Sequence, residues 1–269
     1  MLKWKNNPKS KYTWRVTFPR LIPVVTLIGN EAFKTREFSN PKYVGDPANT
    51  VSLFSSFEAE ELMVLDISKS FHRERASQEV LSQIIENASM PIAFGGGINS
   101  FENAQRHFDL GFDKLVIRSG LSNFYVAKEI SNHYGTQAVA GCLDYKWNPS
   151  RSQELEINKS AILVKDIPTF LMRLQDSGIG EVIIQDMNSD GLRTGLSSSP
   201  LLELAVEILD IPVVALGGCA SAGNAADFIK LSGCHSVAAS TTFLFRPTRD
   251  AVLVNYPVIN RWHENFEGR

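Results

Sequence analysis

Eight short apolar runs recur along the chain, and the stretches between them have the hydrophobic spacing of amphipathic helices, as in residues 102–112 and 199–209. The runs occupy residues 21–25, 62–67, 91–94, 115–117, 138–143, 181–184, 211–216 and 236–239. Short β-branched strands that alternate with helices are typical of a parallel sheet whose outer face is covered. Eight such units in 269 residues predict an α/β protein with a single (β/α)8 TIM barrel. The competing architecture, a doubly wound sheet, usually has fewer strands and one glycine fingerprint.

The two halves of the chain resemble each other. MPIAFGGGINSFENA (90–104) resembles IPVVALGGCASAGNA (211–225), and EELMVLD (60–66) resembles GEVIIQD (180–186), so the offset is about 120 residues in both cases. This repeat predicts two half-barrels, which close on each other because an open half would expose a sheet edge. We therefore expect one barrel over residues 19–260, a basic N-terminal extension over 1–18 and a C-terminal tail over 261–269.

Charge and composition exclude several function classes. The net charge of −2 gives no reason to expect binding to nucleic acid or to a membrane surface. The first 20 residues hold six basic side chains and no acidic one, which fits either a solvated tail or a contact with a partner. No run has the length of a signal peptide core or a membrane span, so the expected location is the cytoplasm. The five histidines form no i, i+4 pair, and neither a metal nor a cofactor is expected.

Active sites of such barrels lie at the carboxyl ends of the strands. Two pairs of glycines stand at such ends in corresponding places of the two halves. The candidate phosphate cradles are Gly96–Gly97 with Arg118 and Ser119, and Gly217–Gly218 with Ser240. Glycine lets backbone N–H groups approach an oxyanion, although a lone glycine pair is more often a tight turn. Because the pair is duplicated in register, we expect a ligand with a phosphate at each end.

Thr26 and Asp144 end two apolar runs at corresponding positions of the two halves. A carboxylate ringed by apolar walls would have the raised pKa that general acid–base catalysis needs, and this makes Asp144 the candidate catalytic residue. The alternative is a structural aspartate with a hydrogen-bonded carboxylate at a turn. Thr26 has no carboxylate, so one of the two acids that a symmetric barrel would place at its mouth is absent.

Other residues near the strand ends are candidates for contacts with substrate. Asp66 either binds substrate hydroxyls or caps the loop that follows it. Lys34 lies in a long polar loop, residues 29–47, and such loops on the catalytic face often act as lids, although exposed lysines are usually only solvated. Asp190 and Gly191 follow the sixth run, where we expect a contact with substrate and with a phosphate.

A second group of charged residues stands at the opposite ends of the strands. These residues are Arg20, Glu61, Lys114 and Glu181. Two bases and two acids that converge on the lower rim of a barrel can pair into a ring. Such a ring either caps the core and holds the strands in register, or gates a passage along the barrel axis. Spacing alone favours the structural role.

These residues and motifs resemble one known family. From Arg20 to about Phe245 the chain is similar to the cyclase subunit of imidazole glycerol phosphate synthase, through the motifs PRLIPV, GDP (45–47), LMVLDI, FGGGINSFENA, GFDKL, NSDG and LGGCA. The resemblance implies a barrel with a glutaminase docked under its lower mouth. Ammonia released there would pass through the barrel to a bis-phosphorylated substrate. The four rim residues match the gate of that family, and Lys34 matches its substrate-contacting loop lysine.

The chain also departs from that family. The family uses two aspartates as acid and base, at the ends of strands one and five. Asp144 matches the second, and Thr26 stands in place of the first. A threonine hydroxyl is not a base near neutral pH unless another group activates it. Arg118 replaces an asparagine of one phosphate site, and EINKSAI (156–162) stands where the family has Thr-His-Gly-Gly-Arg.

A narrower resemblance agrees with these departures. NPKYVGDP (40–47), VALGG (214–218) and RDAVLVNYP (249–257) are similar to a branch associated with acetamidino sugars of surface polysaccharides, whose members lack the first aspartate. This branch implies a glutaminase partner and a separate ATP-dependent sugar amidotransferase. We therefore expect an ammonia-handling barrel in an O-antigen type of pathway. The alternatives are a true cyclase of histidine biosynthesis and a non-catalytic ammonia conduit.

Overall fold

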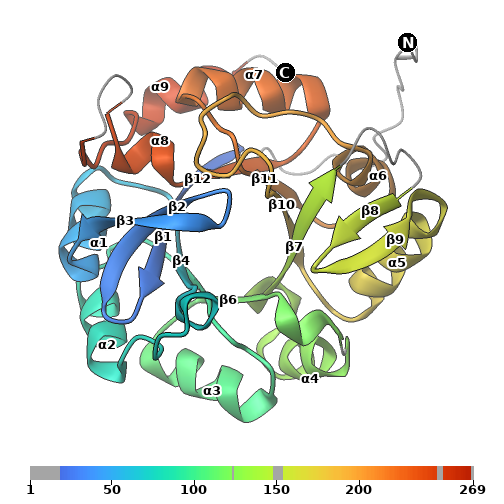
Figure 1. The fold of residues 1–269 in the computed structure, drawn as a ribbon, viewed down its shortest axis with the longest axis horizontal. Coiled ribbons are helices and arrows are strands. Elements are labelled where there is room, and N and C mark those ends of the chain that lie inside the picture. Colours follow the sequence, from blue (N-terminus) through green and yellow to red (C-terminus); the bar gives the residue numbers. More distant parts are fainter. Residues whose placement is uncertain (1–18, 123, 148–153, 247–250, 268–269) are drawn as a thin grey trace.

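Eight parallel strands close into a barrel that is surrounded by helices in the computed structural model, which describes residues 19–122, 124–147, 154–246 and 251–267 (Figure 1). Around the barrel the strands are β1 (Arg20–Ile28), β4 (Leu62–Asp66), β5 (Ile92–Gly95), β6 (Lys114–Ile117), β7 (Val139–Trp147), β10 (Glu181–Asp186), β11 (Val213–Leu216) and β12 (Ser236–Ala239). Pairing of β12 with β1 closes the ring, as does pairing of β7 with β10. The predicted TIM barrel is confirmed, and each predicted run lies on one barrel strand.

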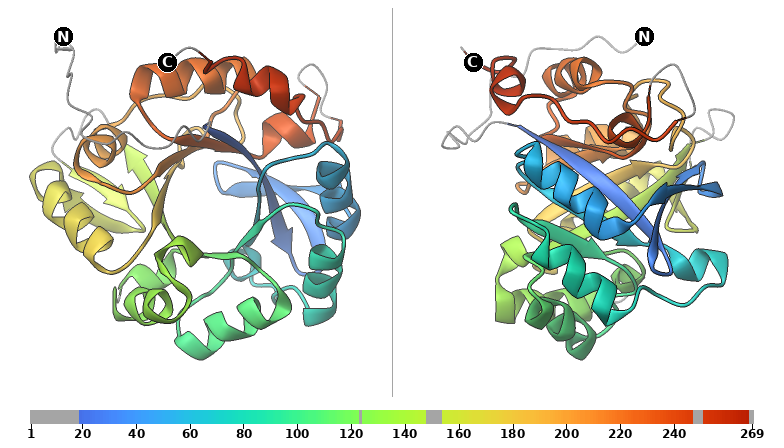
Figure 2. Two further views of the ribbon diagram at one scale, coloured as in Figure 1. Left: turned by 180° about the vertical axis from the view of Figure 1, so that it is seen from behind. Right: turned by 90° about the vertical axis from the view of Figure 1, so that its left-hand side faces the viewer.

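The helices cover the outside of the barrel, as both views in Figure 2 show. They are α1 (Pro47–Ser56), α2 (Gln78–Glu86), α3 (Phe101–Leu110), α4 (Phe124–Tyr134), α5 (Ile167–Asp176), α6 (Pro200–Ile208), α7 (Ala222–Ser232), α8 (Thr241–Leu244) and α9 (Ile259–His263). Short 3-10 turns span Ser68–Phe71, Ser119–Ser122, Thr136–Ala138 and Val164–Asp166. The predicted helical stretches 102–112 and 199–209 overlap α3 and α6.

Serine residues start the helices at matching points of the two halves. Ser77, Ser100, Ser199 and Ser221 cap α2, α3, α6 and α7, and each side chain accepts a hydrogen bond from the backbone N–H three residues later. Such a cap satisfies a donor that the first turn leaves unpaired. Gly111 and Gly233 end α3 and α7 in the left-handed conformation that glycine adopts without strain. The two halves of the chain therefore also repeat the residues that start and end these helices.

Two apolar layers form the core. The inner layer fills the barrel with side chains from all eight strands: Ile22, Val24, Met63, Ala93, Val116, Ala140, Cys142, Ile183, Val214, Leu216 and Ala238. The outer layer packs the other face of each strand against the helices. Successive side chains of a strand point to opposite faces, so a strand buried on both faces must be apolar throughout. This is why the barrel strands appear as continuous apolar runs.

Two hairpins extend the barrel at the mouth that Figure 1 faces. After β1 the chain forms β2 (Glu31–Arg36) and β3 (Ser39–Gly45), and after β7 it forms β8 (Glu154–Ile157) and β9 (Ser160–Leu163). The expectation of a polar loop over residues 29–47 is therefore wrong. The turn residues are Glu37–Phe38 and Asn158–Lys159, all with positive φ. Two-residue turns of this kind usually carry Asn-Gly or Asp-Gly, so the sequence lacked the usual hairpin signal.

The C-terminal segment packs against the start of β1. The indole of Trp262 donates a hydrogen bond to the Pro19 carbonyl, and the hydroxyl of Tyr256 donates one to Leu21. Trp262 and Phe266 are buried, and the predicted boundary at residue 260 falls inside α9. The predicted basic extension over 1–18 lies outside the described residues. Among the described residues, no helix is both long and apolar enough to cross a membrane.

His107 gives the fold a dependence on pH. Its ring lies 4.4 Å from that of Phe94, and burial, aided by the positive charge of Arg75, lowers its pKa from 6.5 to about 4. The unfolded chain therefore takes up this proton at a higher pH than the folded chain does. We expect the free energy of unfolding to fall as the pH drops from 6.5 toward about 4. The fall should be smaller in the His107→Phe variant, which lacks this titrating group. Thermal unfolding at pH 7 and at about pH 4.5 tests this; an equal loss in both proteins would contradict it.

Candidate functional site

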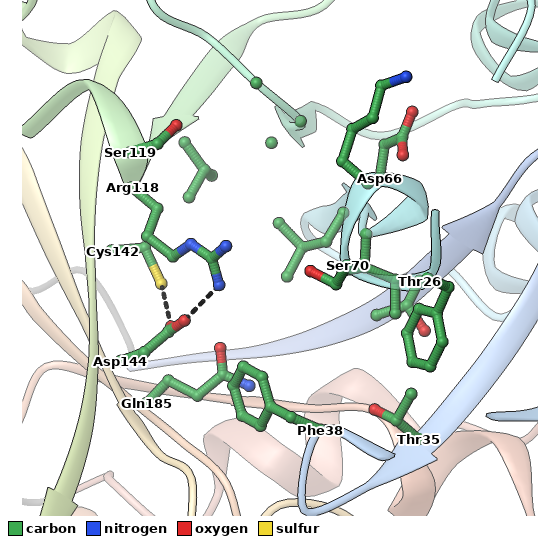
Figure 3. Close-up of a pocket in the computed structure, with 18 of the residues that line it drawn as sticks. Thr26, Thr35, Phe38, Asp66, Ser70, Arg118, Ser119, Cys142, Asp144 and Gln185 are labelled. Atoms are coloured by element: carbon green, nitrogen blue, oxygen red, sulfur yellow. Dashed lines mark hydrogen bonds and ion pairs between the residues drawn. The ribbon is translucent and has the colours of Figure 1, made fainter. Parts of the chain in front are cut away.

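A pocket lies at the mouth formed by the carboxyl ends of the strands (Figure 3). Its cavity volume is about 140 Å3. Of the predicted site residues it brings together Thr26, Lys34, Asp66, Gly96, Gly97, Arg118, Ser119, Asp144 and Asp190. Gly191, Gly217, Gly218 and Ser240 line a smaller, adjoining pocket. Lys34 and Asp190 line both pockets.

Asp144 forms an ion pair inside the larger pocket. Arg118 Nη1 lies 2.6 Å from Asp144 Oδ2, and Cys142 Sγ lies 3.4 Å from Oδ1 (Figure 3). Burial raises the pKa of the Asp144 carboxyl, and the Arg118 guanidinium opposes that shift. The direction agrees with the expectation from sequence. The carboxylate is nevertheless not free, because a guanidinium occupies one of its oxygens.

The backbone around Asp144 is held by the turn of the second hairpin. Asp144 N donates to Asn158 Oδ1 at 2.9 Å, and Asn158 N donates to Asp144 O at 2.8 Å. Asn158 Nδ2 also donates to the Cys142 carbonyl at 3.3 Å. Asparagine tolerates the left-handed conformation that this turn requires. The segment EINKSAI therefore positions the end of β7 through one side chain.

Thr26 has a structural contact at the matching place on β1. Its hydroxyl donates a hydrogen bond to the Phe33 carbonyl of β2, and the residue is buried. The bond joins the barrel strand to the first hairpin, which pairs with β1 from Thr26 onward. Since the hydroxyl proton is already used, the oxygen can only accept a further hydrogen bond from a ligand.

Asp66 caps the loop that follows β4. Its Oδ1 accepts from Ser68 N at 2.9 Å and its Oδ2 accepts from Ala76 N at 3.0 Å. Arg75 Nη1 lies 3.6 Å from Oδ1. Of the two roles that the sequence left open, loop capping is the one for which the structure provides contacts.

Lys34 is buried, in contrast to an ordinary loop lysine. Its Nζ lies 2.9 and 3.1 Å from the two carboxylate oxygens of Asp190, and Thr35 Oγ1 lies 3.3 Å from one of them. Glu37 N donates to the Asp190 carbonyl at 2.9 Å, which fastens the hairpin to the loop after β10. Strand β2 turns Lys34 toward the mouth, and this explains why the side chain is only 6% exposed.

The first glycine turn is filled by a guanidinium. A Cβ on Gly97 would lie 2.2 Å from Arg75 Nη2 and 2.5 Å from Arg75 Cζ. Gly97 also has a φ of +71°, so both its conformation and its neighbour require glycine. The sequence did not single out Arg75, because it lies in the charged segment HRER, nine residues after the end of β4.

The second glycine turn has unsatisfied polar atoms beside it. Gly217 and Gly218 have positive φ, and a Cβ on either would lie 2.6 Å from a backbone oxygen. Arg193 donates to the carbonyls of Thr241 and Phe245. Arg193 Nε, Ser240 Oγ and Thr241 Oγ1 are buried with no partner among the described residues. Buried polar atoms of this kind are normally paired, so they are available to a ligand. Arg193 is a second residue that sequence reasoning missed.

The four charged rim residues form a closed ring at the opposite mouth. Arg20 contacts Glu61 and Glu181, and Lys114 Nζ lies 2.8 Å from each of the same two carboxylates. Burial alone would raise the pKa of Glu181, but Arg20 and Lys114 outweigh it and hold that pKa below its ordinary value. The strands that carry these residues are not all neighbours. The contacts therefore reach across the mouth.

The described residues include no group of three or more histidine, cysteine, aspartate or glutamate side chains that could hold a metal ion. The three pairs Asp66–Arg75, Asp144–Arg118 and Asp190–Lys34 instead give each of these pocket carboxylates a cationic partner. Such an arrangement can hold an anionic ligand in exchange for part of its internal pairing.

Comparisons with known proteins agree with this geometry. The model of the family described as "Histidine biosynthesis protein" matches residues 20–248. The chain is 30% identical over 244 residues to a Pseudomonas aeruginosa protein provisionally named imidazole glycerol phosphate synthase subunit hisF2, covering 90% of this chain and 97% of the relative. A Leptospira borgpetersenii protein provisionally named as the HisF subunit is 31% identical over 242 residues, covering 89% and 95%.

A third relative is the imidazole glycerol phosphate synthase subunit HisF of Bacteroides fragilis, which is 30% identical over 239 residues, covering 88% of this chain and 95% of the relative. All three matches extend over nearly the whole barrel. The fold, the family model and these relatives lead to the same conclusion: this chain belongs to the histidine biosynthesis protein family and is HisF-like.

Proposed function

We propose that this barrel is the ammonia-handling subunit of a glutamine amidotransferase pair and serves the conversion of an acetamido into an acetamidino group on a surface-polysaccharide sugar. Its partners are a glutaminase, docked at the mouth where the strands begin, and a separate ATP-dependent sugar amidotransferase. The reaction takes place in the cytoplasm. The ligand at the other mouth is a phosphorylated small molecule, and the proposal needs no metal or cofactor.

One observation carries this proposal: among the described residues, the positions of Thr26 and Asp144 offer no free pair of carboxylates at the mouth. A cyclase of this family would need an acid and a base at the positions of Thr26 and Asp144. The Thr26 hydroxyl is used on the Phe33 carbonyl, and Asp144 is paired with Arg118. Loss of one of two cooperating acid–base groups costs about 10²–10⁴-fold in rate. This favours ammonia transfer over cyclisation, with Asp144 as the remaining candidate if the barrel does chemistry of its own.

The charged ring supports a gate for ammonia. Arg20, Glu61, Lys114 and Glu181 close the mouth where the strands begin, below the apolar inner layer. A neutral ammonia molecule can pass an apolar layer, whereas an ammonium ion would have to leave its hydration shell behind. If one ion pair of the ring broke, a path to the barrel interior would open while the barrel stayed folded.

The second candidate function is that of the cyclase in histidine biosynthesis, and the names of the relatives favour it. The buried polar atoms near Gly217–Gly218 and Ser240 are suited to a phosphate under either function. A conduit without chemistry is the third possibility. These three functions differ in what the barrel does with ammonia and with the ribonucleotide of the histidine pathway.

A cyclase assay separates the two main candidates. We expect the protein, mixed with an ammonium salt and the bis-phosphorylated ribonucleotide of the histidine pathway, to form no imidazole product. We expect Thr26→Asp to gain no activity, because a carboxylate there cannot donate to Phe33 and Asp144 stays paired with Arg118. Product formation is measured directly. Turnover by the unaltered protein at an ordinary cyclase rate would refute the proposed function.

Substitution of Lys114 tests the gate. Lys114→Met removes one cation that both Glu61 and Glu181 contact, so the ring loses half of its bridges. With the glutaminase, the ATP-dependent amidotransferase, ATP and the acceptor sugar present, we expect glutamine hydrolysis to continue while the amidinated product per glutamine falls severalfold. Lys128→Met, on the exposed face of α4, is the matched control and should leave this ratio unchanged. An unchanged ratio of product to hydrolysed glutamine in Lys114→Met would contradict the gate and leave the ring with a structural role only.

A further inference from the structure

We propose that an open cavity between the first hairpin and the loop after β4 binds a neutral sugar ring that carries an acylamino group. One wall of this cavity comes from residues within 28–33, at the turn between β1 and β2, and the other from residues within 71–75. The inference deepens the proposed function by giving the barrel a site for the acceptor. It rests on that function only for the sugar's role as acceptor.

The size of this cavity fits a sugar, and the size of the pocket around Asp144 does not. The cavity volume is about 680 Å3, compared with about 140 Å3 for the pocket that contains Asp144, which we call the mouth pocket. Small-molecule sites usually enclose about 300–1,000 Å3, whereas a cavity of about 150 Å3 holds a molecule of the size of benzene. An acylated amino sugar is much larger than benzene. The mouth pocket therefore has room for a reacting group but not for the whole ring.

Hydrogen bonds hold the two walls together at their base. The hairpin and the loop lie at the same end of the barrel (Figure 2). Gly29 N donates to Ser68 Oγ at 2.8 Å, and Ser77 N donates to Asn30 Oδ1 at 2.8 Å. The loop is also fixed by the Asp66 carboxylate, which accepts from two of its backbone N–H groups. The cavity is therefore formed before a ligand binds, and binding has little ordering entropy to overcome.

Aromatic and aliphatic side chains give the cavity an apolar face. Phe33 and Phe71 line it together with Ile28, and the ring of Tyr43 packs edge-on against Phe33, with the ring centroids 5.7 Å apart. A sugar ring has a matching face, since its C–H groups gather on one side while its hydroxyls point outward around the edge. Rigid aromatic side chains bury such a face at a low cost in conformational entropy.

Polar groups without a partner of their own line the same cavity. Asn30 Oδ1 is used by Ser77 N, which leaves both N–H donors of Asn30 Nδ2 for a ligand. Glu31 and Arg73 are exposed, and neither side chain has an ion pair within the described part of the chain. Carboxamide, carboxylate and guanidinium groups together supply the donors and acceptors that a ring with several hydroxyls requires.

The balance of charge in the cavity favours a neutral ligand. Its charged lining residues are two acids and two bases: Glu31, Glu74, Arg73 and Arg75. Arg75 Nη1 lies 3.6 Å from Asp66 Oδ1, and Glu74 Oε2 lies 3.4 Å from Lys69 Nζ, so one member of each kind already has a partner. An anion would meet the carboxylates as well as the guanidinium groups. Hydroxyl groups can donate to the former and accept from the latter, and an amide can do the same.

Phe71 and Arg75 place this cavity next to the mouth pocket. Both residues line both spaces, so they form the partition between them. A sugar whose ring lies against Phe33 can extend its acylamino group past this partition toward the mouth pocket, where ammonia leaves the barrel in the proposed function. The site thus presents the group to be amidinated, and the separate amidotransferase activates that group with ATP.

Binding of N-acetylglucosamine to the full-length protein tests this site. Saturation-transfer difference NMR, without glutaminase or amidotransferase, should show signals from both the sugar ring and the acetyl methyl group. A ligand of this size should bind with a Kd on the order of 1 mM. Glucose is equally neutral but lacks the acylamino group, so we expect it to bind severalfold more weakly. Neither inorganic phosphate nor ATP at the same concentration should displace the sugar.

Three variants locate the bound sugar. Phe33→Leu keeps an apolar side chain but removes the aromatic face, and it should weaken binding by about threefold to tenfold. Asn30→Asp keeps the oxygen that Ser77 N contacts and removes the N–H donors, so it should weaken binding of N-acetylglucosamine more than that of glucose. Phe38→Leu is the matched control and should leave the Kd unchanged, because Phe38 belongs to the same hairpin and lines the mouth pocket but not this cavity.

Several outcomes would overturn the proposal. The absence of saturation transfer to N-acetylglucosamine would mean that the barrel has no sugar site, and equal affinity for glucose would mean that the acylamino group is not recognised. An equal loss of binding in Phe38→Leu would place the sugar in the mouth pocket. Displacement by phosphate or ATP would make the cavity an anion or nucleotide site. The cyclase assay uses no sugar acceptor, and the gate assay supplies the amidotransferase, so failure here is distinguishable from failure of the proposed function.

Discussion

Closure of the parallel sheet is the constraint on which the rest of this structure depends. Pairing of β12 with β1 and of β7 with β10 brings the two ends of a repeated chain into one ring. The eight barrel strands all point the same way, so their carboxyl ends meet at one mouth and their amino ends at the other. Residues far apart in sequence thereby come into contact, such as Lys34 with Asp190 above and Arg20 with Glu181 below. The pocket and the ring are both products of closure.

Buried charge then determines what each mouth can do. A carboxylate inside a protein must be paired or protonated, and at the pocket the chain pairs all of Asp66, Asp144 and Asp190 with cations. At the other mouth two acids share two bases in a ring. A group that is tied to a guanidinium is poorly placed to exchange protons. The same pairing that makes these charges tolerable inside the barrel therefore moves the site away from acid–base chemistry and toward the binding of an anion.

Much of this could be predicted because it depends on local patterns. The barrel strands follow from continuous apolar runs, and the helix starts follow from serine caps such as Ser100 and Ser221. Strand ends identified most of the pocket, since a parallel barrel has one catalytic face. The hairpin β2–β3 was missed because its turn, Glu37–Phe38, lacks glycine and asparagine. That error also hid the burial of Lys34, which a strand, and not a loop, turns toward the mouth.

The sequence by itself determined the barrel, its twofold repeat, the positions of the glycine turns and the absence of a carboxylate at Thr26, because these depend on residue type and on spacing along the chain. Only the tertiary structure decided which residues the charged side chains contact. Arg118 could have faced solvent, and Arg75 belongs to a segment of mixed charge with no periodicity. Their contacts with Asp144 and Gly97 exist because neighbouring strands end side by side, and that distance in space cannot be read from distance in sequence.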